Sequence, residues 1–310
     1  MACVSWVSGC FCDSAVGADL AAGDPANDGG NGNRDRQFVS RFLSHADDKI
    51  HLMPEVKSGP TERFSDRVED YVKYRPHYSF EVVQALRSAC GLCPQHLVVD
   101  VGCGTGLLAK IFLENGNRVA GVEPNAEMRE AGERFLASFA TFSMVAGTAE
   151  ATTLPDRYAD FVVAGQAFHW FQPTPTRTEF ARIVKPEGWV VLVWHDRDLD
   201  STPFLRAYEE FLQRYGTDYS SVAHNKVANY SALERFYAPN QMQLIVQSTQ
   251  QQFDLEGLRG RLLSSSYAPR EGPAAEAMLQ ELPNLFAEHA QDEKVVFEYW
   301  TRIYYGHLTA

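Results

Sequence analysis

The chain has 310 residues, of which 45% are hydrophobic, so it can form one large domain, or a domain with a cap, around a sizeable core. Its formal net charge of −12 at pH 7 disfavours DNA or RNA as a substrate, because an acidic surface repels phosphate backbones. No apolar run approaches the ~20 residues of a membrane helix, and residues 1–12 lack the basic start and cleavage site of a signal peptide. We therefore expect a cytoplasmic protein with neither a nucleic-acid nor a membrane partner.

The six cysteines stand at spacings that suggest no disulfide framework, which fits a reducing compartment. Cys90 and Cys93 form a CxxC pair, but no second pair accompanies it. Gly91 and Pro94 are typical of a helix end, so we favour that interpretation over a metal or redox site. No metal site is predicted.

Residues 1–58 are predicted to form a disordered extension, because their central part is rich in Gly, Asp, Asn and Ala and shows no apolar periodicity. A helix is then expected over residues 64–75, whose apolar side chains share one face and which Pro76 ends. A second helix is expected over residues 80–89, with Ser79 as its N-cap.

A buried strand over residues 97–101 is followed at once by Gly102, Gly104 and Gly106, and residues 107–113 then have helical spacing. The glycines let the backbone turn sharply and let a ligand approach the main chain without a Cβ in the way. A dinucleotide fingerprint would place Gly or Ala at position 107, where this chain has Leu, so nicotinamide binding fits poorly.

The next predicted strand, residues 118–122, ends at Glu123, about 20 residues after the glycines, as in dinucleotide-binding folds. A carboxylate there is placed to accept hydrogen bonds from two ribose hydroxyls. The other interpretation is an acid at a helix N-terminus, stabilised by the helix dipole. A helix is predicted over residues 126–139 and a third strand over residues 141–145.

A fourth strand is expected over residues 158–165, followed by the turn Gln166-Ala167-Phe168-His169-Trp170-Phe171. Ligands of open α/β sheets lie beyond the carboxyl ends of the strands. Gln166 and His169 would be costly to bury without partners unless they line a polar cleft, whereas the rings alone could be core packing. His169 is the residue we nominate as a general base, because an imidazole ordinarily titrates near neutrality; His195 is a weaker candidate.

A helix over residues 174–184 and a strand over residues 189–194 complete five βα steps, which predict a parallel, doubly wound sheet with right-handed crossovers. After residue 198 the pattern changes. Helices are expected at residues 203–215, 255–263 and 274–289, and segments of β character at residues 242–253 and 295–305. We expect a core domain over residues 59–200 and a cap with the last strands over residues 201–310.

Several motifs together resemble class I S-adenosylmethionine (SAM) dependent methyltransferases, in particular the methyltransferase type 11 and ubiquinone/menaquinone methyltransferase-like group that acts on small molecules. They are Gly-x-Gly-x-Gly two residues after Asp100, F-x-x-x-V-x-x-Y-x-x-Y-R-P-x-Y at residues 64–78, G-Q-A-F-H-W-F at 165–171, K-P-x-G at 185–188 and S-x-S-Y-x-P at 264–269. The resemblance implies a Rossmann-like α/β sheet that ends in an antiparallel strand pair, with a helical cap over the substrate pocket.

The same resemblance implies the residues of the site. SAM would contact Tyr71, Arg75, Asp100, Gly102, Gly104, Glu123, Met128, Ala149, Glu150 and Gln166. His169 and Tyr267 would be the catalytic residues, with Tyr267 reaching the acceptor from the cap. Tyr71 could instead be an aromatic anchor of a packing helix, and Tyr267 a packing residue at a helix end.

We therefore predict an enzyme that transfers a methyl group from SAM to a small-molecule acceptor, as a monomer or homodimer. The fourth strand is not followed by the Asn/Asp-Pro-Pro-Tyr/Phe signature of amino-group methylation on adenine or glutamine. An NAD-dependent oxidoreductase and a non-catalytic SAM-binding scaffold are the alternatives.

Overall fold

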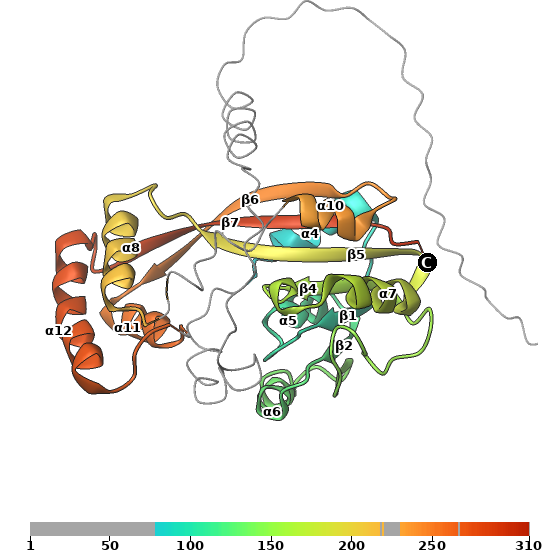
Figure 1. Ribbon diagram of the computed structural model, residues 1–310, viewed down its shortest axis with the longest axis horizontal. Coiled ribbons are helices and arrows are strands. Elements are labelled where there is room, and N and C mark those ends of the chain that lie inside the picture. Colours follow the sequence, from blue (N-terminus) through green and yellow to red (C-terminus); the bar gives the residue numbers. More distant parts are fainter. Residues whose placement is uncertain (1–77, 218, 220–229, 266, 310) are drawn as a thin grey trace, which may run out of the picture. The chain divides into compact units, whose positions relative to one another are not determined.

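The computed structural model describes residues 78–217, 219, 230–265 and 267–309 (Figure 1). The chain divides into two units, Met1–Glu55 and Val56–Ala310, and all described residues belong to the second. The predicted extension and the predicted helix that contains Tyr71 and Arg75 lie outside the described residues.

Seven strands form one sheet in the order β3-β2-β1-β4-β5-β7-β6. The first five are parallel to one another, and β7 is antiparallel to both of its neighbours, β5 and β6. The predicted doubly wound α/β sheet with a C-terminal antiparallel pair is therefore confirmed. The strands are β1 (Leu97–Val101), β2 (Arg118–Val122), β3 (Phe142–Val145), β4 (Ala159–Gly165), β5 (Val184–Arg197), β6 (Gln243–Phe253) and β7 (Val295–Gly306).

Apart from α10 and the 3-10 turn η2, for which no helix limits were predicted, the helices that the structure describes lie close to their predicted positions. They are α4 (Glu81–Cys90), α5 (Leu107–Glu114), α6 (Ala126–Phe135), the 3-10 turn η2 (Phe168–Trp170), α7 (Pro173–Ile183), α8 (Pro203–Tyr215), α10 (Tyr230–Tyr237), α11 (Leu255–Leu263) and α12 (Gly272–His289). None of these helices combines the length and the apolar character needed to cross a membrane.

Both faces of the parallel sheet are covered, which explains the nearly continuous apolar sequence of β1. Val98 packs with residues of α4 and α5 on one face. Val99 and Val101 pack with residues of α7 and α10 on the other. Successive side chains of a strand point to opposite faces, so a strand buried on both sides is apolar throughout.

Helix α4 ends as the CxxC interpretation predicted. Gly91 is its C-cap, with a left-handed φ of 64°, and its N–H donates to the Leu86 carbonyl. Glycine adopts this conformation without the steric cost of a Cβ. Cys90 is buried and belongs to the core beneath α4.

Three element limits differ clearly from the prediction. Strand β5 begins at Val184 rather than at residue 189, because Val184 already pairs with Ala159 of β4. Helix α6 ends at Phe135, four residues early, because the buried Leu136 leaves the helical conformation and packs against the glycine loop. Strand β5 continues to Arg197, because its last residues pair with β7: His195 lies opposite Thr301, and Arg197 opposite Tyr299. The strand therefore extends beyond the apolar run that marked it in the sequence.

Helices α8, α11 and α12 gather at the end of β6 and β7 that lies away from the parallel strands (Figure 1). They form a third apolar cluster with the strand residues Phe253 and Phe297. The predicted domain limits at residues 58 and 200 stay predictions.

Candidate functional site

The glycine loop after β1 has three positive φ angles: 69° at Gly102, 58° at Gly104 and 86° at Gly106. A Cβ on Gly102 would stand 2.7 Å from the Ala167 Cβ, so no larger residue fits. A Cβ on Gly104 would meet only the Met128 Cε, at 3.5 Å. Gly102 therefore serves close packing, whereas Gly104 leaves its backbone open beside Met128.

Glu123 joins this loop to the end of β2. Its Oε2 accepts a hydrogen bond from Gly104 N at 2.9 Å, and its Oε1 accepts one from Asn125 N at 2.9 Å. Burial raises the pKa of the Glu123 carboxyl, although the two amide donors oppose the rise. A carboxylate has about four acceptor positions, so two remain for the hydroxyls of a ribose.

Asp100 lies inside the loop rather than on its surface. It is 1% exposed, and neither carboxylate oxygen has a regular hydrogen bond within the described residues. Burial raises the pKa of Asp100 to about 7, while the nearby Cys103 thiol and Ala109 amide lower it. The buried position of Asp100 beneath the glycines is consistent with a side chain that supports the loop from inside.

The loop after β3 carries Ala149 and Glu150. Ala149 is buried in the core. The Glu150 Oε1 accepts hydrogen bonds from Gln172 N at 2.8 Å and from the Thr176 hydroxyl at 3.4 Å. Glu150 thereby caps α7, which has no side-chain cap of its own. This contact gives Glu150 a structural role, and its predicted contact with the adenine stays a prediction.

The residues of the turn after β4, which the sequence analysis treated as one group, have different surroundings in the structure. Gln166, with a φ of 52°, donates its Nε2 to the His195 carbonyl oxygen at 2.8 Å. Phe168 is buried against Phe236, whereas His169 is exposed and its ring lies 4.9 Å from that of Trp170. Desolvation by the surrounding protein lowers the pKa of His169 to about 4, so this imidazole does not titrate near neutrality, which was the reason for nominating it as a base.

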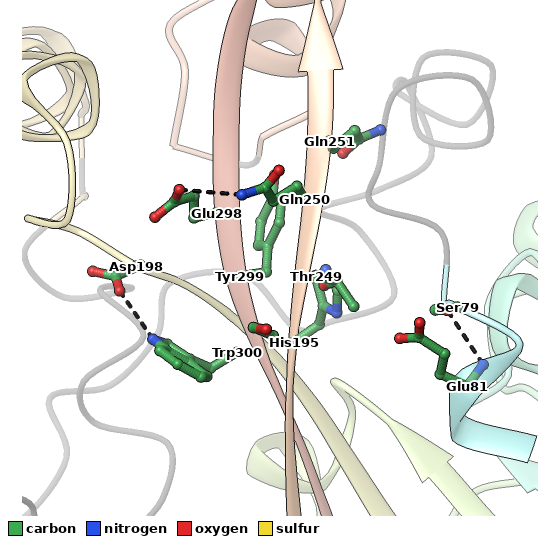
Figure 2. A pocket seen from close by; sticks show the side chains of 11 residues that line it. Ser79, Glu81, His195, Asp198, Thr249, Gln250, Gln251, Glu298, Tyr299 and Trp300 are labelled. Atoms are coloured by element: carbon green, nitrogen blue, oxygen red, sulfur yellow. Dashed lines mark hydrogen bonds between the residues drawn. The ribbon is translucent and has the colours of Figure 1, made fainter. Parts of the chain in front are cut away.

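His195 lies at the end of β5 and lines a pocket of about 700 Å³ together with Tyr299 (Figure 2). Its Nδ1 is 2.8 Å from the Thr301 hydroxyl, and its ring stacks on Tyr299 with centroids 4.5 Å apart. Burial, and secondarily the charge of Arg261, lower the pKa of His195 to about 4. The imidazole is therefore neutral at pH 7.

Tyr267 is only 4% exposed and lies between α11 and α12, with its ring 4.8 Å from that of Tyr219 in an edge-to-face contact. This burial among the cap residues fits the packing interpretation. Its predicted contact with the acceptor stays a prediction.

The sheet brings most of the predicted cofactor residues to one edge. The glycine loop, Glu123 and Gln166 follow β1, β2 and β4, whose carboxyl ends lie side by side in the parallel sheet. Met128 is buried beside Gly104. The pocket residues of β6 and β7 were not predicted, although the polar alternation of residues 247, 249 and 251 could have indicated a polar-lined face.

Residues 99–192 match the family described as the methyltransferase domain. An uncharacterized methyltransferase of Mycobacterium bovis is 33% identical over 153 residues, which make up 49% of this chain and 60% of that protein. The matched part of the chain thus spans about 60% of the length of this relative.

Two solved structures share the fold. A candidate type II methyltransferase from Anaeromyxobacter dehalogenans superposes with a TM-score of 0.55 at 19% identity, over 76% of this chain and 99% of that chain. A candidate methyltransferase of an antibiotic biosynthesis pathway from Anabaena variabilis gives a TM-score of 0.54 at 21% identity, over 74% and 98%.

The strand order and the acid-flanked glycine loop define a Rossmann-like methyltransferase fold. Residues 99–192 carry the match to the methyltransferase domain family, and the described residues share the fold of the solved methyltransferases.

Proposed function

We propose that the protein transfers a methyl group from SAM to a small-molecule acceptor. The observation that carries this proposal is the hydrogen bond between Glu123 and Gly104 at the carboxyl ends of β1 and β2. It fixes a carboxylate with free acceptor positions beside a backbone that no Cβ covers. A nucleoside ribose needs this combination.

The residues present fit the cofactor on that edge. Glu123 would accept the ribose hydroxyls, Gly104 would let the main chain approach, and Met128 would pack on the adenine. When bound, SAM supplies a methyl group on a sulfonium with a good leaving group. The protein then has to align the acceptor, exclude water and, for some acceptors, remove a proton.

The pocket beside His195 is the acceptor site in this proposal. We place it next to the cofactor site, because Gln166 at the end of β4 donates a hydrogen bond to the His195 carbonyl oxygen at the end of β5. A volume of about 700 Å³ falls within the range typical of small-molecule sites. His169 and the neutral His195 are the two imidazoles available to take a proton. We further propose a cytoplasmic monomer or homodimer.

Calorimetry on the full chain tests the cofactor, with SAM, S-adenosylhomocysteine and NAD as titrants. We expect both sulfur nucleosides to bind and NAD not to bind. A screen of small-molecule acceptors, read by the release of S-adenosylhomocysteine, then tests the transfer. Absence of SAM binding would overturn the proposal, and SAM binding without transfer to any acceptor would indicate a scaffold.

A further inference from the structure

Strand β6 forms one edge of the sheet, and its outer side pairs with no strand within the described residues (Figure 1). Its inner side pairs with β7 along all 11 residues, from Gln243 to Phe253, without a shift in register. In an antiparallel strand, alternate residues direct their N–H and C=O groups to opposite sides. The outer side of β6 therefore presents a regular row of backbone groups with which another strand can pair.

Strand β6 lacks the features by which proteins usually protect such an edge. Those features are a short strand, a bulge, a proline or charged side chains, lysine above all. The opposite edge of the sheet is protected by its length, because β3 has only four residues. In contrast, no charged residue stands between Arg235 and Asp254, a stretch that contains the whole of β6. The strand is thus long, regular, and free of proline and of charge.

Two large apolar side chains of this strand are also exposed. Leu244 is 38% exposed and Val246 is 36% exposed. The two residues are two positions apart, so their side chains lie on the same face of the sheet. An open strand edge beside exposed apolar side chains is typical of a surface that another chain covers.

The charge of the chain indicates a second copy as the occupant of this edge. The formal net charge of −12 opposes contact between copies. In a two-fold interface, side chains near the axis meet their own images, so a charged residue there would meet a like charge. The uncharged edge avoids this repulsion. Antiparallel pairing of two identical edges also leaves neither of them open.

The apolar side chains indicate the register of the pairing. With the two-fold axis at Ile245, Leu244 lies directly opposite the partner's Val246, and Val246 lies opposite the partner's Leu244. Directly opposite side chains of antiparallel strands pack against each other. Gln243 then lies opposite the partner's Gln247, and two amides can hydrogen-bond to each other, since each both donates and accepts. This register therefore covers both exposed apolar side chains.

We propose that the protein forms a homodimer in which the outer edges of two β6 strands pair antiparallel about a two-fold axis at Ile245. The two seven-stranded sheets then form one continuous sheet. Residues 248–251 of the same strand line the pocket beside His195. The partner subunit consequently lies next to the proposed acceptor site. The dimer itself does not depend on methyl transfer.

Sedimentation equilibrium of the full chain over a range of concentrations tests the dimer. We expect the wild type to form a species of twice the mass of the chain. Val246→Lys should raise the dissociation constant at least about tenfold, because it brings like charges together near the axis and removes an apolar pair. Leu255→Lys, at a residue of equal exposure in the first turn of α11, is the control and should leave the constant unchanged.

Two double variants test the register. Leu244→Lys/Val246→Lys places lysines opposite lysines, whereas Leu244→Glu/Val246→Lys places glutamates opposite lysines. We expect the second variant to dimerise at least about tenfold more tightly than the first. The overall charge would predict the reverse, because two added lysines make the net charge of the chain less negative.

A wild-type chain that stays monomeric would overturn the proposal. A dimer that Val246→Lys leaves unchanged would also overturn it, because the contact would then use another surface. Equal affinities of the two double variants would exclude the register at Ile245. Near-UV circular dichroism shows whether each variant is folded. Should Val246→Lys lose the folded spectrum, Leu244→Lys, which charges the same edge, takes its place.

Discussion

The carboxylate of Glu123 and the amide of Gly104 are 2.9 Å apart, so the end of β2 and the glycine loop form one hydrogen-bonded unit. The Asn125 amide fixes the second carboxylate oxygen from the other side. The carboxylate is therefore held in one orientation before any ligand arrives. Such preorganisation lowers the entropic cost of binding.

Glu123→Gln should weaken SAM binding by about tenfold to a hundredfold, because hydrogen bonds to a charged acceptor contribute about 1.5–3 kcal/mol. Glutamine keeps one acceptor oxygen but turns an NH2 group toward an amide that itself donates. Calorimetry of SAM measures the effect. Glu127→Gln, an exposed acid in the first turn of α6, is the control. Equal affinities in the two variants would contradict the role of Glu123.

Alanine should have different effects at two positions of the glycine loop. Gly102→Ala would force a Cβ to 2.7 Å from the Ala167 Cβ at a φ of 69°. We therefore expect overpacking to cost about 1–3 kcal/mol in the free energy of unfolding, in addition to about 1–2 kcal/mol of backbone strain. Gly104→Ala meets only a flexible methionine end, so it should cost about 1–2 kcal/mol of backbone strain while weakening SAM binding. Urea unfolding measures the loss of stability in each variant, and calorimetry measures its affinity for SAM. Unchanged SAM binding by Gly104→Ala would show that the ligand does not approach that backbone.

His169 is tested as a general base by His169→Ala. Removal of a base lowers turnover by about 10²–10⁴-fold. SAM affinity should be unchanged, because the exposed His169 ring packs against Trp170 rather than in the glycine loop. Turnover with an acceptor found in the screen measures the effect. A variant with the turnover and pH profile of the wild type would exclude this role. His289→Gln, at the end of α12, is a control for the loss of an imidazole elsewhere.

Much of the fold could be predicted because its signals are local. The apolar run of β1, followed by glycines, specifies a buried strand and a turn within about ten residues of sequence. The end of α6 could not be predicted in the same way. It depends on Leu136 packing against Gly106, and no pattern within the helix marks that contact.

The acceptor pocket depends on contacts that are remote in the sequence. The register of β5, β7 and β6 brings Arg197, Tyr299 and Thr249 into one row. In the sequence, Arg261 resembles Arg259, which is exposed on the same helix. Only the packing of α11 against the sheet distinguishes the two arginines. The predicted contacts of Tyr71 and Arg75 lie outside the described residues.

A buried network around Glu179 predicts acid sensitivity. The carboxylate accepts hydrogen bonds from Arg182 and from the amide and hydroxyl of Thr152. These partners, Arg182 first, lower the pKa of Glu179 from 4.5 to about 2. A lowered carboxyl pKa stabilises the folded state above the unfolded value, and this stability is lost as the pH falls from about 4.5 to about 2.

Glu179→Gln should therefore lower the free energy of unfolding at neutral pH, and its deficit should shrink as the pH falls through that range. Urea unfolding at several pH values measures the free energy of unfolding of the wild type and of Glu179→Gln as a function of pH. Glu187→Gln, an exposed acid in the first residues of β5, should follow the wild type throughout. A deficit independent of pH would mean that lost packing, rather than the charge of Glu179, causes the effect.

His195 should make the free energy of unfolding depend on pH in a higher pH range than Glu179 does. Burial first, and the Arg261 charge second, lower the pKa of His195 from 6.5 to about 4. Between these two pH values the imidazole is protonated in the unfolded chain but not in the folded protein. Folding stability must then rise with pH between about 4 and 6.5. His195→Asn removes the titrating group and leaves an amide that can still meet the Thr301 hydroxyl, so the curve should be flatter in that range.

Urea unfolding of the two proteins between pH 4 and 7 measures this effect, and His289→Gln controls for the loss of an imidazole. Arg261→Met gives an independent check on the cause. Because it removes the neighbouring charge but leaves His195 buried, it should raise the pKa of His195 and narrow the sensitive range without abolishing it. If Arg261→Met left the pH range unchanged, burial alone would account for the lowered pKa of His195.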